Sequence, residues 1–375
     1  MSAISVMRLG AVARKEWIQL RRDPRSMILA FALPLFLLLF FGYAITWDVR
    51  DLRLVLLDQD RTASSRALAG AFEGSGYFTW VEHAGSAADV ERAILRGSAV
   101  GGLVIPPGFA RDLAARRGAP VQLLLDGGDA NTATIALSYA EAIVARHSMD
   151  VLLRGARVEP PAVAESRVWY NPTLESRNMI VPGLIAVIMS IIAAMLTALT
   201  IAREWERGTM EQLAATPVHR LEVVFGKMLP YLGIGMFDVA VTVVAGIAIF
   251  GVPFRGSVLL LAAMTLLFLL GALGLGMFIS AALKSQVLAT QVAMVATYLP
   301  ALLLSGFLFD IASMPVVLRA VTYIVPAKYY ITVTRGVFLK DVGLEALWLQ
   351  AGSMVLFAAV GIGLAAAAFH KRIAQ

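Results

Sequence analysis

The chain has 375 residues, of which 59% are hydrophobic and 15% are charged, and its mean hydropathy is +0.75. The apolar residues gather in runs of about 20 residues or more, so a single soluble globular protein is excluded. Cysteine is absent, which excludes disulfides, thiolate metal sites and cysteine nucleophiles.

The charged residues are unevenly distributed. Residues 48–176 carry 13 arginines and no lysine against 16 acidic residues, a net charge of −3, whereas the rest of the chain carries +9. The basic surplus lies beside the apolar runs, as the positive-inside rule expects of a membrane protein. The high pI of 9.7 is explained by this basic surplus and therefore gives no evidence of nucleic-acid binding.

The N-terminal segment predicts an amphipathic helix. Among five basic side chains, apolar residues recur at spacings of three and four: Val6, Leu9, Ala13, Trp17 and Leu20. We interpret residues 1–25 as an interfacial helix on an anionic membrane face, because Trp17 suits the headgroup layer. A solvated basic leader is the alternative.

Residues 26–47 are uncharged and long enough to cross the hydrocarbon core, so they predict transmembrane helix 1. Arg25 precedes the run and Asp48 follows it, which places the N-terminus in the cytoplasm. A cleaved signal peptide fits less well, because residues 42–47 offer a poor cleavage site.

Residues 48–176 differ from the rest of the chain, because short apolar runs alternate with helical stretches. Short buried strands are predicted at 52–57, 77–81, 99–105 and 121–125, and helices at 62–73, 86–95, 107–117 and 131–153. This alternation predicts a small α/β domain with a largely parallel sheet. Because one span precedes it, the domain is expected outside the cytoplasm.

The remainder, residues 177–375, predicts five more spans, at 180–202, 223–250, 258–283, 287–309 and 346–369. The total of six returns the C-terminus to the cytoplasm, in agreement with His370-Lys371-Arg372. Before the last span, residues 310–345 contain Pro315 and Pro326, which predict short re-entrant helices on the outer side. The fold class is an α-helical polytopic membrane protein of six transmembrane helices with an inserted extracytoplasmic α/β domain.

Enzymatic signatures are absent from the sequence. No G-x-x-x-x-G-K-[ST] loop is present, so the chain has no ATPase motif of its own. The four histidines are scattered, with no H-E-x-x-H, and no serine lies in G-x-S-x-G, so we expect neither a metal site nor catalytic residues.

A polar island lies between the second and third spans, within a predicted cytoplasmic loop at 203–220. Its sequence from residue 203 to 218 is R-E-W-E-R-G-T-M-E-Q-L-A-A-T-P-V. We expect a short helix that starts near Thr209 and ends before Pro217, with Glu206 and Glu211 available to a cationic partner.

The island resembles a segment of the permease subunits of type-2 ABC exporters, in particular the bacterial multidrug-type group with a large periplasmic domain after the first span. The resemblance extends over nearly the whole chain. It continues in Glu222, Gly226-Lys227 and Leu229-Pro230-Tyr231, at the outer side in residues 305–309, 313–315 and 335–340, and in the external domain in residues 58–60 and 126–132.

This resemblance implies that two permeases, identical or related, pair in a bacterial inner membrane, and that each docks a cytoplasmic ABC ATPase. The ATPase would bind ATP and Mg²⁺, so this chain needs no cofactor. The external domain would gate release or meet a periplasmic adaptor protein, and the substrate would be hydrophobic or amphiphilic, as drugs are.

Matching the motifs residue by residue gives the expected sites. The ATPase-coupling residues are Glu204, Glu206, Arg207, Gly208, Thr209, Glu211, Gln212, Thr216 and Pro217. The outer gate residues are Gly306, Phe307, Phe309, Met314 and Pro315. A local ion pair at a spacing of three is the alternative role for Glu204 and Arg207.

Three polar residues lie inside predicted spans: Asp238, Gln286 and Gln291. Asp238 would line the substrate route, carry a proton or hydrogen-bond a neighbouring helix, since an unpaired charge there is costly. Gly271, Gly274 and Gly276 favour close packing of helices over a ligand site.

Two other functions remain open from the residues alone. One is a membrane receptor or scaffold whose external domain binds a ligand, although an anchor has no need of the polar island. The other is an intramembrane enzyme that pairs Asp238 with Tyr231 or Lys227.

Overall fold

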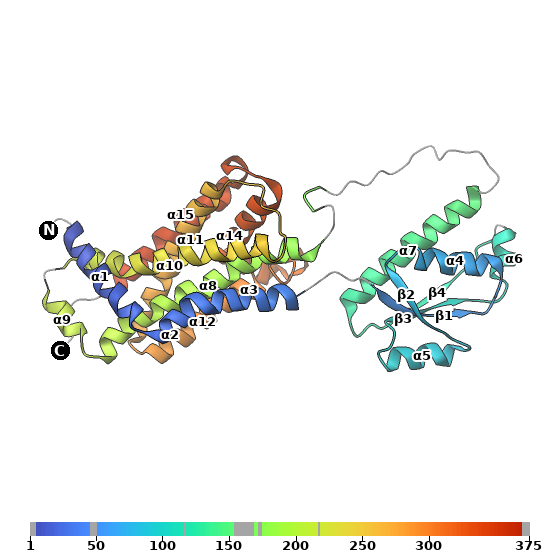
Figure 1. The fold of residues 1–375 in the computed structure, drawn as a ribbon, viewed down its shortest axis with the longest axis horizontal. Helices are drawn as coiled ribbons and strands as arrows, with labels where there is room; N and C mark the ends of the chain where they lie inside the picture. The colour runs from blue at the N-terminus through green and yellow to red at the C-terminus, as the bar shows by residue number, and fades with distance from the viewer. Residues whose placement is uncertain are drawn as a thin grey trace. The chain divides into compact units, whose positions relative to one another are not determined.

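The computed structural model describes residues 5–45, 51–115, 117–153, 169–171, 175–216 and 218–369. It divides into two compact units: Met1–Thr46 together with Val168–Gln375, and Trp47–Arg167. The first is helical and the second is an α/β domain, so the predicted fold class is confirmed (Figure 1). Asp48, Pro217 and His370-Lys371-Arg372, on which parts of the prediction rest, lie outside the described residues.

The N-terminal helix is α1 (Val6–Arg21). Its buried face carries Ala13, Glu16 and Leu20 and packs against α10 (Arg220–Ala248). Trp17 lies at the border of this face and is 46% exposed. A position in the headgroup layer remains a prediction that this exposed indole supports.

The predicted first span is a helical run in three segments: α2 (Pro24–Met27), the π-helical η1 (Ile28–Ala32) and α3 (Leu33–Ala44). Pro34 cannot donate a backbone hydrogen bond, which accounts for the change of pitch just before it. Residues 24–44 together give about 30 Å of helix, the thickness of a hydrocarbon core.

Five helices of the described residues are long and apolar enough to cross a membrane, in addition to the shorter apolar helix Ala30–Ala44 of the predicted first span: α8 (Ser176–Glu206), α10 (Arg220–Ala248), α11 (Val258–Leu283), α12 (Gln286–Leu303) and α15 (Leu344–Ala368). They match the five spans predicted after the external domain. The first of these, α8, is buried along nearly its whole length and contacts the other helices around it, so it is the centre of the helical unit.

Small residues let the helices approach closely. A Cβ on Gly274 would lie 2.5 Å from the carbonyl carbon of Gly361 in α15, and one on Gly276 would lie 2.3 Å from the carbonyl oxygen of Ala194 in α8. Any larger residue would separate these backbones, so the two glycines serve packing, as the sequence indicated.

The segment between α12 and α15 contains a 3-10 turn η2 (Ile311–Ser313), α13 (Val316–Thr322), α14 (Pro326–Arg335) and the π-helical η3 (Gly336–Lys340). The helices Val316–Thr322 and Pro326–Lys340 meet at an angle of 73°. Such a bend is found in a re-entrant hairpin or in a broken span. If it is a broken span, this pair adds a sixth span to the five long helices of the described residues.

The α/β domain runs β1 (Leu52–Asp58), α4 (Ala63–Glu73), β2 (Phe78–His83), α5 (Ala87–Leu95), β3 (Gly101–Ile105), α6 (Phe109–Ala114), β4 (Gln122–Leu125) and α7 (Ala130–Leu153). The strand order is β2-β1-β3-β4. The first three strands are parallel, and β4 is antiparallel to β3. The predicted strands, helices and largely parallel sheet are therefore confirmed.

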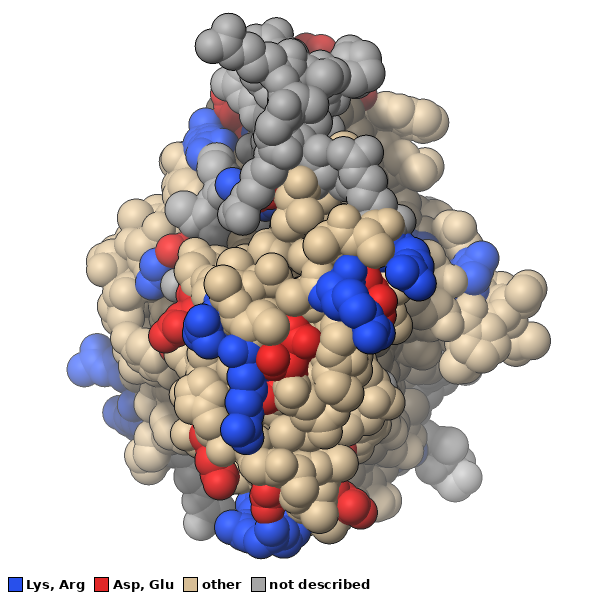
Figure 2. Space-filling view, turned by 90° about the vertical axis from the view of Figure 1, so that its right-hand side faces the viewer, with Lys and Arg blue, Asp and Glu red and all other residues tan. Residues whose placement is uncertain are grey.

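Successive side chains of β1 point to opposite faces of the sheet and contribute to a hydrophobic core on each face. Leu54 and Leu56 face α4 and α7, whereas Val55 and Leu57 face α5. Gly102 in β3 brings α5 close to the sheet, because a Cβ there would lie 2.3 Å from Val90 Cγ1. Figure 2 shows a face of the molecule on which acidic and basic side chains are interspersed, as suits a solvated surface.

Asp60, directly after β1, holds the start of α6 in place. Its carboxylate accepts hydrogen bonds from the backbone N–H groups of Gly108 (2.8 Å) and Ala110 (3.0 Å) and from the Thr62 hydroxyl (2.7 Å). The hydrogen bond from Thr62, followed by those from the backbone amides, lowers the pKa of Asp60 below its ordinary value of 3.8.

We expect this carboxylate to make the domain's stability depend on pH. Because the folded pKa is the lower one, the stabilisation is full above about pH 4 and is lost as the pH falls through the folded value. Asp60→Asn should therefore lower the thermal transition of the domain at pH 7, and the difference from wild type should shrink below pH 4. Scanning calorimetry would measure it, with exposed Glu141→Gln as the control; a pH-independent difference would contradict the assignment.

Candidate functional site

The polar island forms a sharp corner followed by a short helix. At the end of α8, the backbone N–H of Gly208 donates to the carbonyl of Trp205 (3.1 Å) and that of Thr209 to the carbonyl of Glu204 (3.0 Å). This Schellman pattern needs a left-handed residue, and Gly208 supplies it with a φ of 69°. The chain then enters α9 (Met210–Ala215), the short helix predicted after Thr209.

The start of α10 is tied to the N-terminus. His219 caps α10, and Glu222 accepts the backbone N–H of His219 (2.7 Å). The buried Glu222 carboxylate also accepts the backbone N–H of Ser5 (2.6 Å) and pairs with Arg8 (3.2 Å). The Glu222 of the quoted motif therefore fastens α1 to α10.

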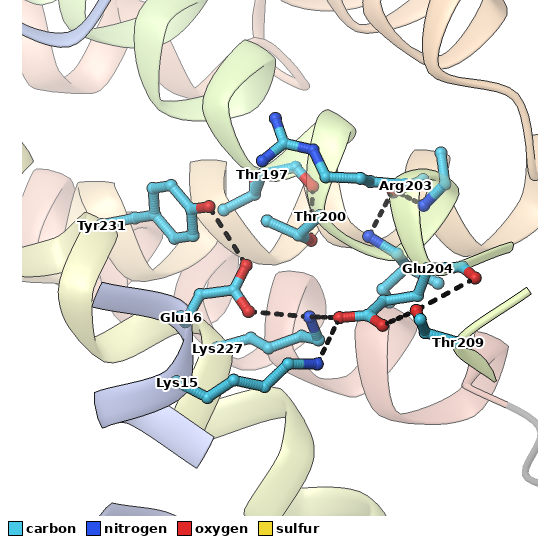
Figure 3. Close-up of polar contacts among 12 residues, drawn as sticks. Lys15, Glu16, Thr197, Thr200, Arg203, Glu204, Thr209, Lys227 and Tyr231 are labelled. Carbon is cyan, nitrogen blue, oxygen red and sulfur yellow. Dashed lines mark hydrogen bonds and ion pairs between the residues drawn. The ribbon is translucent and has the colours of Figure 1, made fainter. Parts of the chain in front are cut away.

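A buried ionic cluster joins α1, α8 and α10 (Figure 3). Lys227 Nζ lies 2.9 Å from Glu16 Oε2 and 3.2 Å from Glu204 Oε1. Lys15 Nζ lies 2.7 Å from the same Glu204 oxygen, and the Tyr231 hydroxyl donates to Glu16 (3.2 Å). Glu16, Glu204 and Lys227 are only 1–3% exposed. The side chain of Lys15 is 51% exposed, and its charge together with that of the buried Lys227 balances the two buried carboxylates, a neutral arrangement that an interior tolerates.

The cluster reaches the polar island directly. The Thr209 hydroxyl donates to Glu204 Oε2, so the corner before α9 is bonded to the same carboxylate that holds Lys15 and Lys227. A displacement of α9 would therefore act on α1 and α10 through Glu204. We call Lys15, Glu16, Glu204 and Lys227, with Thr209 and Tyr231, the buried ionic cluster.

A second set of polar contacts holds α8 to α12 and to the start of the first span. Arg203 pairs with Asp23 (2.9 Å) and contacts Gln286 (3.4 Å). Glu206 accepts the backbone N–H of Gln286 (2.7 Å) and also its side-chain amide. The carboxylate thus lies at the N-terminus of α12, where negative charge is favoured.

The predicted coupling residues divide into two groups. Arg207, Gly208, Glu211, Gln212 and Thr216 are exposed, and we call these five residues the coupling surface, after the role that the motif match predicts for them. Glu204 differs from the prediction: it points inward to Lys15 and Lys227 instead of outward or to Arg207, because α1 packs over this end of α8 and α10. Glu206 is exposed but holds α12, Thr209 is half-buried, and Pro217 lies outside the described residues.

Lys15, Glu16 and Asp23 were missed by sequence reasoning. Their partners are about 180 to 210 positions away in the chain, so no local spacing reveals them. One signal was present: Glu16 is the single acidic residue among the first 22, on the buried side of a basic helix. A lone acid on such a face suggests a buried cationic partner.

Of the three residues predicted to lie within the membrane, Asp238 is on a different helix from the two glutamines. Asp238 is buried in α10, and its Oδ2 has no hydrogen-bond partner among the described residues, whereas its backbone carbonyl accepts from Thr242 (2.8 Å). Gln286 and Gln291 lie at the start of α12, near Arg203. No group of three or more histidine, aspartate or glutamate side chains in the described ranges is arranged to hold a metal ion.

One of the predicted outer gate residues, Gly306, contacts an arginine. Phe307 is buried, Phe309 and Pro315 are exposed, Gly306 and Met314 are half-buried, and Gly306 has a φ of 79°. Arg335 in α14 donates to the carbonyls of Met179 (3.2 Å) and Gly306 (3.2 Å). Arg335 therefore links α14 to α8 and to the loop after α12.

Comparison with known proteins identifies the chain. The model of the ABC-2 family transporter protein matches residues 24–367. The chain is 39% identical over 338 residues to the probable multidrug ABC transporter permease YbhS of Escherichia coli strain K12, which covers 90% of this chain and 89% of the relative. It is 30% identical over 369 residues to the probable multidrug ABC transporter permease YbhR of the same strain, with 98% and 99% covered.

A third relative is more distant. The inner membrane transport permease YhhJ of the same strain is 24% identical over 332 residues, with 85% of each chain covered. The resemblance drawn from the polar island is thus confirmed along the chain. The protein belongs to the ABC-2 transporter family, as a multi-pass permease of an ABC exporter in a family whose membrane subunits lack an ATPase domain.

Proposed function

We propose that the coupling surface docks a cytoplasmic ATPase and that the buried ionic cluster transmits its movement to α1 and α10. The observation that carries this proposal is the bond from Thr209 to Glu204, since one carboxylate contacts both the corner before α9 and the lysines of the other helices. ATP hydrolysis, with its Mg²⁺, belongs to the partner. The movement of the ATPase would be transmitted to the membrane helices through α8 and α10.

The partner permease is proposed to be a second, related chain. YbhS and YbhR come from one bacterial strain, and this chain is similar to both. A pair of related permeases would place two coupling surfaces side by side for two ATPases. An identical second copy is the other arrangement, and the composition of the purified complex distinguishes them.

The proposed location is a bacterial inner membrane with both termini cytoplasmic and the α/β domain in the periplasm. The net charge of −3 on the domain segment and +9 elsewhere supports this orientation. The domain would lie at the exit of the path, where it gates release or meets a periplasmic adaptor. Two relatives, YbhS and YbhR, are probable multidrug permeases, which favours a hydrophobic or amphiphilic, drug-like substrate.

Purification tests this function. The tagged full chain would be extracted from native membranes in mild detergent and the bound proteins identified by mass spectrometry. We expect an ATPase that contains the G-x-x-x-x-G-K-[ST] loop, together with a permease. If no ATPase is recovered even after crosslinking, the exporter loses its energy source and a receptor or scaffold role takes its place.

The outer gate yields a separate prediction. Arg335→Met should free the loop at Gly306, because the guanidinium donates two charge-assisted hydrogen bonds to backbone carbonyls of other segments. A cysteine placed at half-buried Leu308, in a chain that has no other, should react with a membrane-impermeant maleimide about tenfold faster in this background.

The matched control is Arg319→Met. Arg319 lies on the same hairpin but donates to Ala312 and Met314 of its own segment. We expect this control to leave the Leu308→Cys rate near its starting value. Equal acceleration by both substitutions would show that the hairpin loosens generally and that Arg335 has no special place in the gate.

A further inference from the structure

A cavity of about 1080 Å³ opens beside the buried ionic cluster, between α1, α2, α8 and α12. It is large enough for a drug-sized molecule. Lys15 of the cluster lines this cavity, together with Arg203 and Glu206 of the neighbouring polar contacts. The proposed function assigns no ligand to this cavity.

The cavity wall has a positive surplus. It contains four basic side chains, Lys15, Arg22, Arg203 and Arg207, and two acidic ones, Asp23 and Glu206. Both acids are engaged, Asp23 by Arg203 and Glu206 by the start of α12. Arg22 and Arg207 are exposed and form no ion pair with another described residue. Two guanidinium groups therefore face the cavity with hydrogen-bond donors to spare.

The rest of the wall is apolar. Ile18, Pro24, Leu199 and Val287 contribute carbon surface. From Val287 the exposed apolar face of α12 continues through Val292 and Val295, which are 43% and 56% exposed. Positive groups at one end and a long apolar track at the other match a molecule with an anionic head and a hydrocarbon tail.

We propose that this cavity binds an anionic amphiphile, with its headgroup on Arg22 and Arg207 and its tail along Leu199 and Val287. The ligand is either exported cargo or a resident lipid with a phosphate headgroup, since both have this chemistry. Only its identification as cargo rests on the proposed function. Binding itself needs no ATPase.

Protection of a single cysteine measures the binding. Thr290 is half-buried in the cavity wall, and Thr290→Cys gives the purified full chain one thiol, because the natural sequence has none. Dodecyl phosphate should slow its reaction with maleimide in a saturable way. Inorganic phosphate and the uncharged dodecyl maltoside should not, because each lacks one half of the ligand. Absence of protection by dodecyl phosphate overturns the proposal.

Two adjacent arginines provide the matched variants. Arg22, the residue that follows α1, lines the cavity, whereas Arg21, the exposed last residue of α1, does not. Arg22→Gln should weaken the protection about tenfold, the effect of one lost charge-assisted contact, and Arg21→Gln should leave it within about twofold. Equal weakening by both would mean general attraction to a basic helix and would also overturn the site.

The source of the ligand is resolved in vesicles. In phosphatidylcholine vesicles with added phosphatidylglycerol, protection that persists when the ATPase partner and ATP are present identifies a resident lipid. Protection by dodecyl phosphate that ATP hydrolysis relieves identifies cargo. Both results support the site. Arg207 belongs both to the coupling surface and to this cavity, so the protection measured on the purified chain without the ATPase is the result that is independent of docking.

Discussion

Lys227→Met is expected to destabilise the helical unit by about 3–5 kcal/mol, because it leaves the buried carboxylates of Glu16 and Glu204 with only Lys15 to compensate them. The thermal transition of the purified full chain in mild detergent should fall on the order of 10 °C. Export should fall with it, since the corner before α9 loses its connection to α10.

A paired substitution distinguishes charge balance from loss of a bulky side chain. Glu16→Gln combined with Lys227→Met removes one charge of each sign and leaves Lys15 paired with Glu204, so it should recover at least half of the lost stability. Lys284→Met is the control, because this exposed lysine lies over the Trp205 ring and is worth about 1 kcal/mol or less. A double variant no more stable than Lys227→Met would contradict the cluster.

Glu211→Arg is expected to abolish recovery of the ATPase and export while the chain still folds and inserts. Glu211 is exposed at the start of α9, so reversing its charge costs little folding stability. At an interface the same reversal replaces attraction by repulsion, and a loss of about 100-fold in affinity is expected. Copurification of the ATPase measures it directly.

The control for that variant is Glu345→Arg. Glu345 is another exposed acid in the first turn of a helix, at the start of α15 and outside the coupling surface. It should retain the ATPase and export at wild-type levels. Normal ATPase recovery with Glu211→Arg would remove Glu211 from the proposed interface.

The elements that the sequence predicted are those with a strong local signal. Long apolar runs with few charges located the spans after residue 177, and Thr209 and Pro217 marked the two ends of the short helix α9. Alternating β-branched and Leu-rich runs located all four strands. These patterns could not predict that β4 runs antiparallel to β3, because hydrophobic periodicity is the same for parallel and antiparallel strands.

The geometry of the candidate site was harder to predict from the sequence, because it depends on contacts between distant segments of the chain. Matching motifs placed Glu204 on the coupling surface, whereas the structure buries it against Lys227 and Lys15. No helical spacing predicts that direction, since it follows from the packing of α1 on α10. Glu211 and Gln212 are exposed, as the motif match expects of residues that dock a partner, and their role in docking stays a prediction.

Crosslinking from the coupling surface tests the central claim most directly. Gln212→Cys provides a single thiol on α9 in a chain without any other, and Glu345→Cys provides the same thiol at the start of α15. With a short thiol-to-amine crosslinker in native membranes, we predict an adduct between Gln212→Cys and a cytoplasmic ATPase, and none from Glu345→Cys. Failure to crosslink at residue 212 while the ATPase still copurifies with the chain would contradict docking at α9.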